Sequence, residues 1–313
     1  MKISLPPAIR YFPVSKNAFA FSPGLSAIGE NEKILQIDSN YPDYIQTKIN
    51  NRQKSYNQFV QKYKLNTKLE TATVQFLIKQ LIHDWPEYFK IETLSKGHSN
   101  GYSNDQQLTN NLTSETLKFN KKFELLDSKN QNYHDALDAL LSQIQEDMSI
   151  VTLGQNLDYI PYLHLCFPNF WSAKDKIGKS FIDAHKPVPD MHKINKSHYA
   201  ISSMLASTGP FERFTWGLTT NKDLNQHPDD TKSTARRFDL AKNIYMRIER
   251  QVTVPLPEHN AYLFFIRTYF ENTQNLTTEE KKQLIQSLRS MSEDIALYKG
   301  MAEQRDNIIE RLK

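Results

Sequence analysis

A histidine stands where the chain changes direction, in the segment Phe181-Ile-Asp-Ala-His185-Lys-Pro-Val-Pro189. It follows a short amphipathic stretch, and Pro187 and Pro189 stiffen the backbone just after it. An imidazole held at a helix end before a rigid turn can aim one ring nitrogen in a fixed direction, as an iron ligand must. The alternative is a partly exposed histidine that is hydrogen-bonded to the backbone, and the residue pattern alone favours this second interpretation.

Charged side chains also interrupt strand-like runs. In Arg247-Ile-Glu-Arg-Gln251 the alternation places Arg247, Glu249 and Gln251 on one face of a strand. A charged face among apolar strands indicates either a buried Glu–Arg ion pair or a site for a ligand carboxylate. Arg213 in Phe211-Glu-Arg-Phe-Thr-Trp216 has the same ambiguity, and Arg250 and Arg267 also lie in or beside strand-like runs.

Several other chemistries lack their sequence signatures. The chain has no Gly-rich loop before a helix, no Gly-x-Ser-x-Gly elbow and no His-Glu-x-x-His motif. The single cysteine, Cys166, lies in the apolar run Leu163-His-Leu-Cys-Phe-Pro168, which is typical of a buried structural thiol. No internal disulfide can form, and no cysteine cluster is available for zinc or an iron–sulfur centre.

Composition narrows the class of partner. The 39 basic and 35 acidic residues nearly balance, and no basic stripe alternates with aromatic residues, so we expect no nucleic-acid partner. No run of about 18 apolar residues predicts a membrane span. The N-terminus lacks the apolar run and the cleavage site of a signal peptide, so a cytoplasmic protein is expected.

The chain divides into three regions that differ in residue composition and periodicity. Residues 1–40 contain four prolines and no clear period, and we expect an extended arm. Residues 41–130 are predicted to form a helical region, with two helices before Pro86 and a polar loop or insertion at about 91–130. Residues 131–313 are predicted to form the core together with the C-terminal helices, and the functional part is expected between about 131 and 300.

The core region predicts an α+β fold. A helix is expected at 133–147, short helical stretches near 173–184 and 190–207, and helices near 277–290 and 292–312. Five runs rich in β-branched or aromatic residues, joined in part by hairpin-like turns, predict strands at Met148–Leu153, Tyr159–Phe167, Arg213–Leu218, Ile244–Val254 and Ala261–Phe270. This order predicts a PAS-like, five-stranded antiparallel sheet with helices packed on one face.

The chain resembles the haem-dependent oxidative N-demethylase family, in particular its haem-carrying alpha subunit and relatives. The resemblance spans about residues 41–300, apart from the stretch at 91–130. Four segments carry it, and they follow in the family's order: Ile144-Gln-Glu-Asp-Met148, Cys166-Phe-Pro-Asn-Phe-Trp171 continuing to His185-Lys-Pro-Val-Pro189, Arg247-Ile-Glu-Arg-Gln251 and Phe265-Ile-Arg-Thr-Tyr269. Tyr298-Lys-Gly300 adds a weaker fifth match.

The resemblance implies a PAS-like fold that binds haem b through a histidine. It also implies a monooxygenase-type reaction, the oxygen-dependent removal of a methyl group from a secondary amine such as dimethylamine, with release of formaldehyde. Electrons would come from partner reductase subunits that carry flavin and iron–sulfur centres, whose motifs this chain lacks.

Carried over by position, the resemblance implies His185 as the axial ligand of the haem iron, with His164, His192 and His198 as alternatives. It implies that Arg213 orients bound oxygen or substrate. Arg250 and Arg267 would bind haem propionates or pair within the sheet. The chain departs from the family at Thr215, where an asparagine is usual before the tryptophan, so substrate preference could differ.

Two other functional classes stay open from the sequence. PAS-like folds often sense rather than catalyse, so a non-catalytic haem or small-molecule binding protein is one alternative. A divergent structural relative that has lost haem is the other.

Overall fold

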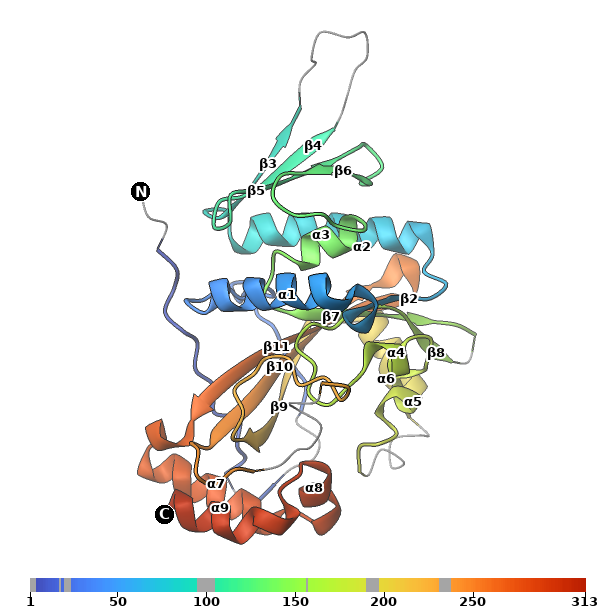
Figure 1. The fold of residues 1–313 in the computed structure, drawn as a ribbon. Coiled ribbons are helices and arrows are strands. Elements are labelled where there is room, and N and C mark those ends of the chain that lie inside the picture. Colours follow the sequence, from blue (N-terminus) through green and yellow to red (C-terminus); the bar gives the residue numbers. More distant parts are fainter. Residues whose placement is uncertain are drawn as a thin grey trace, which may run out of the picture.

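A seven-stranded antiparallel sheet organises the molecule, with the strand order β1-β9-β10-β11-β7-β8-β2 (Figure 1). The computed structural model describes residues 4–16, 18–19, 24–94, 105–155, 157–189, 197–230 and 238–313. The strands of this sheet are β1 Ser26–Ala27, β2 Val60–Lys62, β7 Asp147–Leu153, β8 Asp158–His164, β9 Phe211–Thr219, β10 Tyr245–Leu256 and β11 Ala261–Asn272.

The five predicted strands are confirmed as β7 to β11, and they are adjacent in the sheet. The hairpins β7–β8 and β10–β11 follow from the turn residues at 154–158 and 255–260. The predicted five-stranded sheet is wrong in strand number, because β1 extends it beyond β9 and β2 extends it beyond β8. β1 is too short to show an alternating pattern. β2 follows directly after a helix, so its three residues look like a continuation of the helical periodicity.

The polar stretch predicted as a loop forms a second sheet, and that prediction is wrong. Its four antiparallel strands are β3 Phe89–Thr93, β4 Gln106–Asn110, β5 Glu115–Phe119 and β6 Leu125–Ser128. Polar residues cover its outer face, whereas Leu108, Leu117 and Phe119 are fully buried beneath it. The composition thus reflected the solvated face, whereas the buried face, which also includes Phe89, was marked by only a few apolar side chains.

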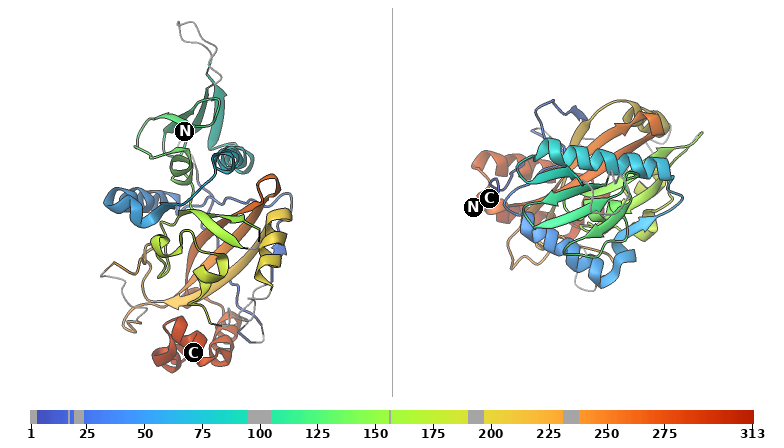
Figure 2. Two further views of the ribbon diagram at one scale, coloured as in Figure 1. Left: turned by 90° about the vertical axis from the view of Figure 1, so that its right-hand side faces the viewer. Right: turned by 90° about the horizontal axis from the view of Figure 1, so that it is seen from above.

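Helices cover both faces of the large sheet, so the prediction of one helical face is wrong (Figures 1 and 2). α1 Tyr41–Phe59, α2 Thr67–Asp84 and α3 Ala136–Leu141 pack on the face that carries Met148, Ile150 and Phe265, which we call the α1–α3 face. Farther along this face, α7 Thr278–Ser290, α8 Glu293–Tyr298 and α9 Arg305–Leu312 enclose Ile248 and Tyr269.

The opposite face receives three short helices. α4 Ala173–Lys176, α5 Phe181–His185 and α6 His198–Ser207 pack against Val151, Leu163 and Tyr262, and we call this the α4–α6 face. Residues 190–196, predicted to begin the last of these helices, lie outside the described residues. This face is where the predicted histidine meets the sheet.

Several predicted helix bounds change. The helix predicted at 133–147 is only six residues long, because Asp147 already begins β7. The helix predicted at 292–312 is interrupted between α8 and α9. Residues 4–40, in their described part, contain β1 and otherwise no helix or strand.

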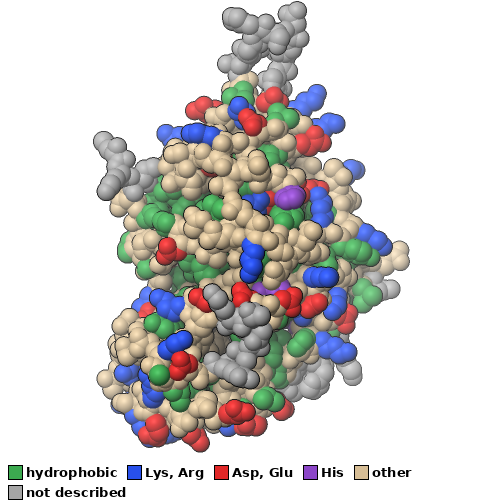
Figure 3. Space-filling view, in the orientation of Figure 1, with side chains coloured by type: hydrophobic (Ala, Val, Ile, Leu, Met, Phe, Trp, Pro, Cys, Tyr) green, Lys and Arg blue, Asp and Glu red, His purple; other side chains and the backbone are tan. Residues whose placement is uncertain are grey.

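Charges of both signs are mixed on one face of the molecule. On the face seen in Figure 3, Lys and Arg side chains are interspersed with Asp and Glu. Among the helices that the structure describes, none combines the length and the apolar character that crossing a membrane requires.

Candidate functional site

His185 closes α5, which is anchored at both ends. The Ser180 side chain caps the helix by accepting a hydrogen bond from the Asp183 backbone, and Ala184 is fully buried. His185 Nδ1 lies 2.8 Å from the Phe181 carbonyl oxygen. Because a carbonyl only accepts, Nδ1 must carry the proton, and the lone pair of the neutral ring is then on Nε2. This is the tautomer and the fixed orientation of a metal-ligating histidine.

The surroundings of His185 keep its ring neutral. Burial lowers the pKa of His185 to about 4, and the positive charges of Arg213 and Lys176 act in the same direction. The rings of Trp171 and Phe181 lie 4.8 and 4.1 Å from the imidazole, centroid to centroid. A neutral imidazole among aromatic side chains can donate its lone pair to iron at neutral pH.

Facing α4–α6, β9 and β10 present a row of polar side chains. The strand register pairs Arg213 with Gln251, Thr215 with Glu249 and Gly217 with Arg247, so the predicted shared face of Arg247, Glu249 and Gln251 is confirmed. Arg213 Nε donates to Gln251 Oε1 at 2.8 Å. Thr215 Oγ1 lies 3.4 Å from Glu249 Oε2. The structure therefore brings His185, Arg213 and Thr215 to one face of the sheet.

The contacts given for Arg247 and Glu249 lead to different partners. Arg247 donates to the Phe167 carbonyl at 2.7 Å and also contacts the carbonyls of Asp223 and Leu224. The guanidinium thus ties β10 to the segment that leads to Trp171. Glu249 instead receives only neutral donors among the residues that the structure describes.

Part of the α4–α6 face is incompletely covered, although Tyr262 and Thr268 on it are buried. Phe264 and Ile266 on β11 are half-exposed, although Leu263 and Phe265, which point to the other face, are fully buried. Within the described part of the chain, a Cβ added at Gly217 would meet no heavy atom closer than 4 Å. A partly exposed apolar surface in the middle of a sheet, next to an aimed imidazole, suits a flat apolar cofactor such as haem.

Arg250 and Arg267 lie on the α1–α3 face, away from this surface. Arg250 donates to Glu212 Oε2 at 2.7 Å and to the carbonyls of Ile34 and Lys33 at 3.0 Å. Arg267 is buried, 3.1 Å from an Asp38 oxygen and 4.2 Å from the centroid of the Tyr44 ring. Of the two roles open from the sequence, pairing within the fold is the one that these contacts support.

Replacing Arg267 with methionine should separate those two roles. We expect the free energy of unfolding to fall by about 3 kcal/mol, because Asp38 keeps a buried charge without its partner. Haem binding per folded molecule should not change. Denaturant unfolding and a haem titration measure the two quantities. The matched control is Arg10→Met, which removes two surface ion pairs, to Glu271 and Glu280, and should cost only about 1 kcal/mol. Loss of haem with unchanged stability would instead support a propionate role.

A second group of potential metal ligands is fully enclosed on the α1–α3 side. Single ligand atoms of Asp147, His164 and Cys166 lie within 4.8 Å of one another, so the group could bind a metal ion. Burial raises the pKa of the Cys166 thiol, in agreement with the predicted buried cysteine. The charges around this cluster are also compensated without a metal ion. Arg52 pairs with Asp138 beside His164, and Lys48 lies close to Asp147.

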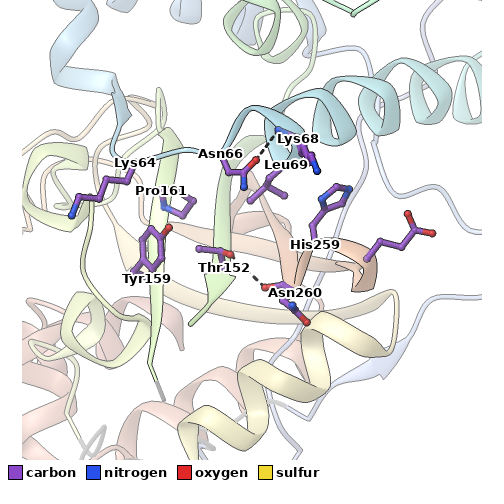
Figure 4. A pocket seen from close by; sticks show the side chains of 10 residues that line it. Lys64, Asn66, Lys68, Leu69, Thr152, Tyr159, Pro161, His259 and Asn260 are labelled. Carbon is purple, nitrogen blue, oxygen red and sulfur yellow. Dashed lines mark hydrogen bonds between the residues drawn. The ribbon is translucent and has the colours of Figure 1, made fainter. Parts of the chain in front are cut away.

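A pocket of about 280 Å³ lies apart from the predicted site, beside the N-terminus of α2 (Figure 4). Asn66 caps that helix, and Thr152, Tyr159 and His259 line the opposite wall. None of the predicted site residues lines it. We therefore assign no role in the chemistry to this pocket.

The fold and the site define an α+β protein with a neutral, rigidly oriented histidine beside an open sheet face. The chain matches, over residues 25–309, the family described as haem-dependent oxidative N-demethylase, alpha subunit-like. It belongs to that family, as the sequence resemblance indicated. The family description implies haem dependence, an oxidative demethylase activity and a multi-subunit assembly.

Proposed function

We propose that the protein is a haem-dependent oxidative N-demethylase component that removes a methyl group from a small secondary amine such as dimethylamine, using oxygen. The family match over residues 25–309 supports the reaction class. The observation that carries the proposal is the His185 ring, whose Nδ1 is held by the Phe181 carbonyl while Nε2 keeps a lone pair.

In this proposal each site residue has one task. His185 Nε2 would hold the iron of haem b, and the half-exposed Phe264 and Ile266 provide apolar surface for the porphyrin. Haem, when bound, supplies the oxidation of the N-methyl group. Arg213 is fixed by Gln251 and presents a cationic donor that can orient oxygen or substrate. Thr215 helps to position the Glu249 carboxylate.

Electrons would have to reach the site from outside the chain. The sequence has one cysteine, which is buried, so it cannot hold an iron–sulfur cluster through cysteines. The family description names an alpha subunit. We therefore propose partner subunits that carry flavin and iron–sulfur centres as the reductase.

The direct test is product formation. We expect the haem-loaded chain, given oxygen, a reductant and dimethylamine, to release formaldehyde and methylamine in equal amounts. Formaldehyde trapping and quantification of methylamine measure the two products, with haem-free protein as the control. A chain that binds haem but forms no formaldehyde above that control would instead be a haem-binding sensor, and the proposed activity would be refuted.

A further inference from the structure

Glu249 places a carboxylate on an inner strand of the large sheet, where charged side chains are uncommon. β10 lies between β9 and β11, and both neighbours of Glu249 in the chain, Ile248 and Arg250, are buried. Glu249 itself is half-exposed on the α4–α6 face. A carboxylate is rarely placed inside a sheet without a partner, because removing its charge from water is costly unless another group compensates it.

The partners that Glu249 has are neutral, and two of them are distant. Asn169 Nδ2 lies 3.4 Å from Oε1, Thr215 Oγ1 lies 3.4 Å from Oε2, and Gln251 Nε2 lies 3.1 Å from Oε2. In the described part of the chain no lysine or arginine forms an ion pair with it, and the adjacent Arg250 pairs with Glu212. Since two carboxylate oxygens offer about four acceptor positions, Oε1 keeps the capacity to accept another N–H.

Arg213 connects Glu249 to the haem-ligand candidate. Gln251 joins the two side chains, because its Oε1 accepts from Arg213 Nε at 2.8 Å and its Nε2 donates to Glu249 Oε2 at 3.1 Å. On its other side, the positive charge of Arg213 acts to lower the pKa of His185. The Glu249 carboxylate therefore lies on the same face of the sheet as the His185 site. Apolar Phe264 and the open space at Gly217 lie on this face too.

We propose that Glu249 is the substrate-binding anion of this site, and that it selects small protonated amines by accepting a hydrogen bond from their N–H. A small secondary amine is a cation at neutral pH and carries two N–H donors together with apolar methyl groups. The cation provides a charged partner, which no lysine or arginine of the described residues gives Glu249 in an ion pair, while the methyl groups contact the apolar part of the same face. The inference rests on the proposed function and assigns its substrate a charge state and a partner.

The test is calorimetric binding to the haem-loaded full chain. Dimethylammonium should bind the wild type, and Glu249→Gln should weaken this binding by about 10- to 100-fold, because a charged hydrogen bond is lost. Isopropanol, a neutral molecule of similar size, should bind equally weakly to both proteins. Across dimethyl-, trimethyl- and tetramethylammonium, wild-type affinity should fall as N–H donors are removed, and Glu249→Gln should flatten that series.

The matched control is Glu258→Gln, which removes the same charge from an exposed residue in the turn between β10 and β11. It should leave every affinity unchanged. Equal dimethylammonium affinity in wild type and Glu249→Gln would overturn the inference, as would tetramethylammonium binding as tightly as dimethylammonium. Failure of the wild type to bind haem or to release formaldehyde would instead refute the proposed function, so the two failures are distinguishable.

Discussion

His185→Ala should abolish the haem absorption spectrum of the protein or shift it strongly while the fold stays intact. Loss of a group that merely orients a metal ligand typically weakens metal binding by about 10- to 100-fold, and loss of the ligand should cost at least as much. The fold should survive because His185 is the last residue of a short helix and only partly buried. A haem titration followed at the Soret band measures the affinity, and far-ultraviolet circular dichroism reports the fold.

Two additions make this experiment decisive. Imidazole added to His185→Ala should restore part of the spectrum by occupying the vacated position. His83→Ala, which removes an exposed histidine at the end of α2, is the control and should leave the spectrum unchanged. If His185→Ala keeps the wild-type spectrum, the ligand is another histidine. His198 would be tested next, since His164 is fully buried on the α1–α3 face and His192 lies outside the described residues.

Arg213→Ala should keep haem and lose turnover. The variant removes a cationic donor without touching His185 or its hydrogen bond to Phe181. Removing one donor that stabilises developing charge at an active site lowers kcat by about 100- to 1000-fold. The Soret band and the rate of formaldehyde release measure the two effects separately.

The matched control for Arg213→Ala is Arg289→Ala, an exposed arginine in the last turn of α7, which should leave both quantities unchanged. Arg213→Lys should recover only part of the rate, since an ammonium group cannot reproduce the planar donor pattern of a guanidinium. Wild-type turnover in Arg213→Ala would remove this residue from the proposed reaction.

The strands of the core could be predicted because their residues alternate and their turns are marked. β10 and β11 carry long runs of β-branched and aromatic residues around Pro255 and Asn260. β1 and β2 could not be predicted, since two or three residues show no period. The sheet of β3–β6 could not be predicted from the sequence for a different reason. Its polar face dominates the composition, and its buried Leu108 and Leu117 look isolated in the sequence.

The site was predictable only in part for a related reason. The proline-stiffened segment left both a metal ligand and a backbone-bonded histidine open at His185, and the family resemblance favoured the ligand. Strand alternation placed Glu249 with Arg247 and Gln251. No sequence pattern could tell which face of the sheet each arginine would occupy, because that depends on which helices cover it. Arg250 and Arg213 lie on adjacent strands yet point to opposite faces. Glu249 was missed as a site residue because its partners, which are neutral among the described residues, are visible only in three dimensions.

The central claim is that the α4–α6 face holds haem through the neutral ring of His185. The most direct measurement is the absorption spectrum of the purified full chain titrated with haem. We expect a Soret band that saturates at one haem per chain and is lost or strongly shifted in His185→Ala. A chain that gives the spectrum of free haem at every ratio would contradict the claim.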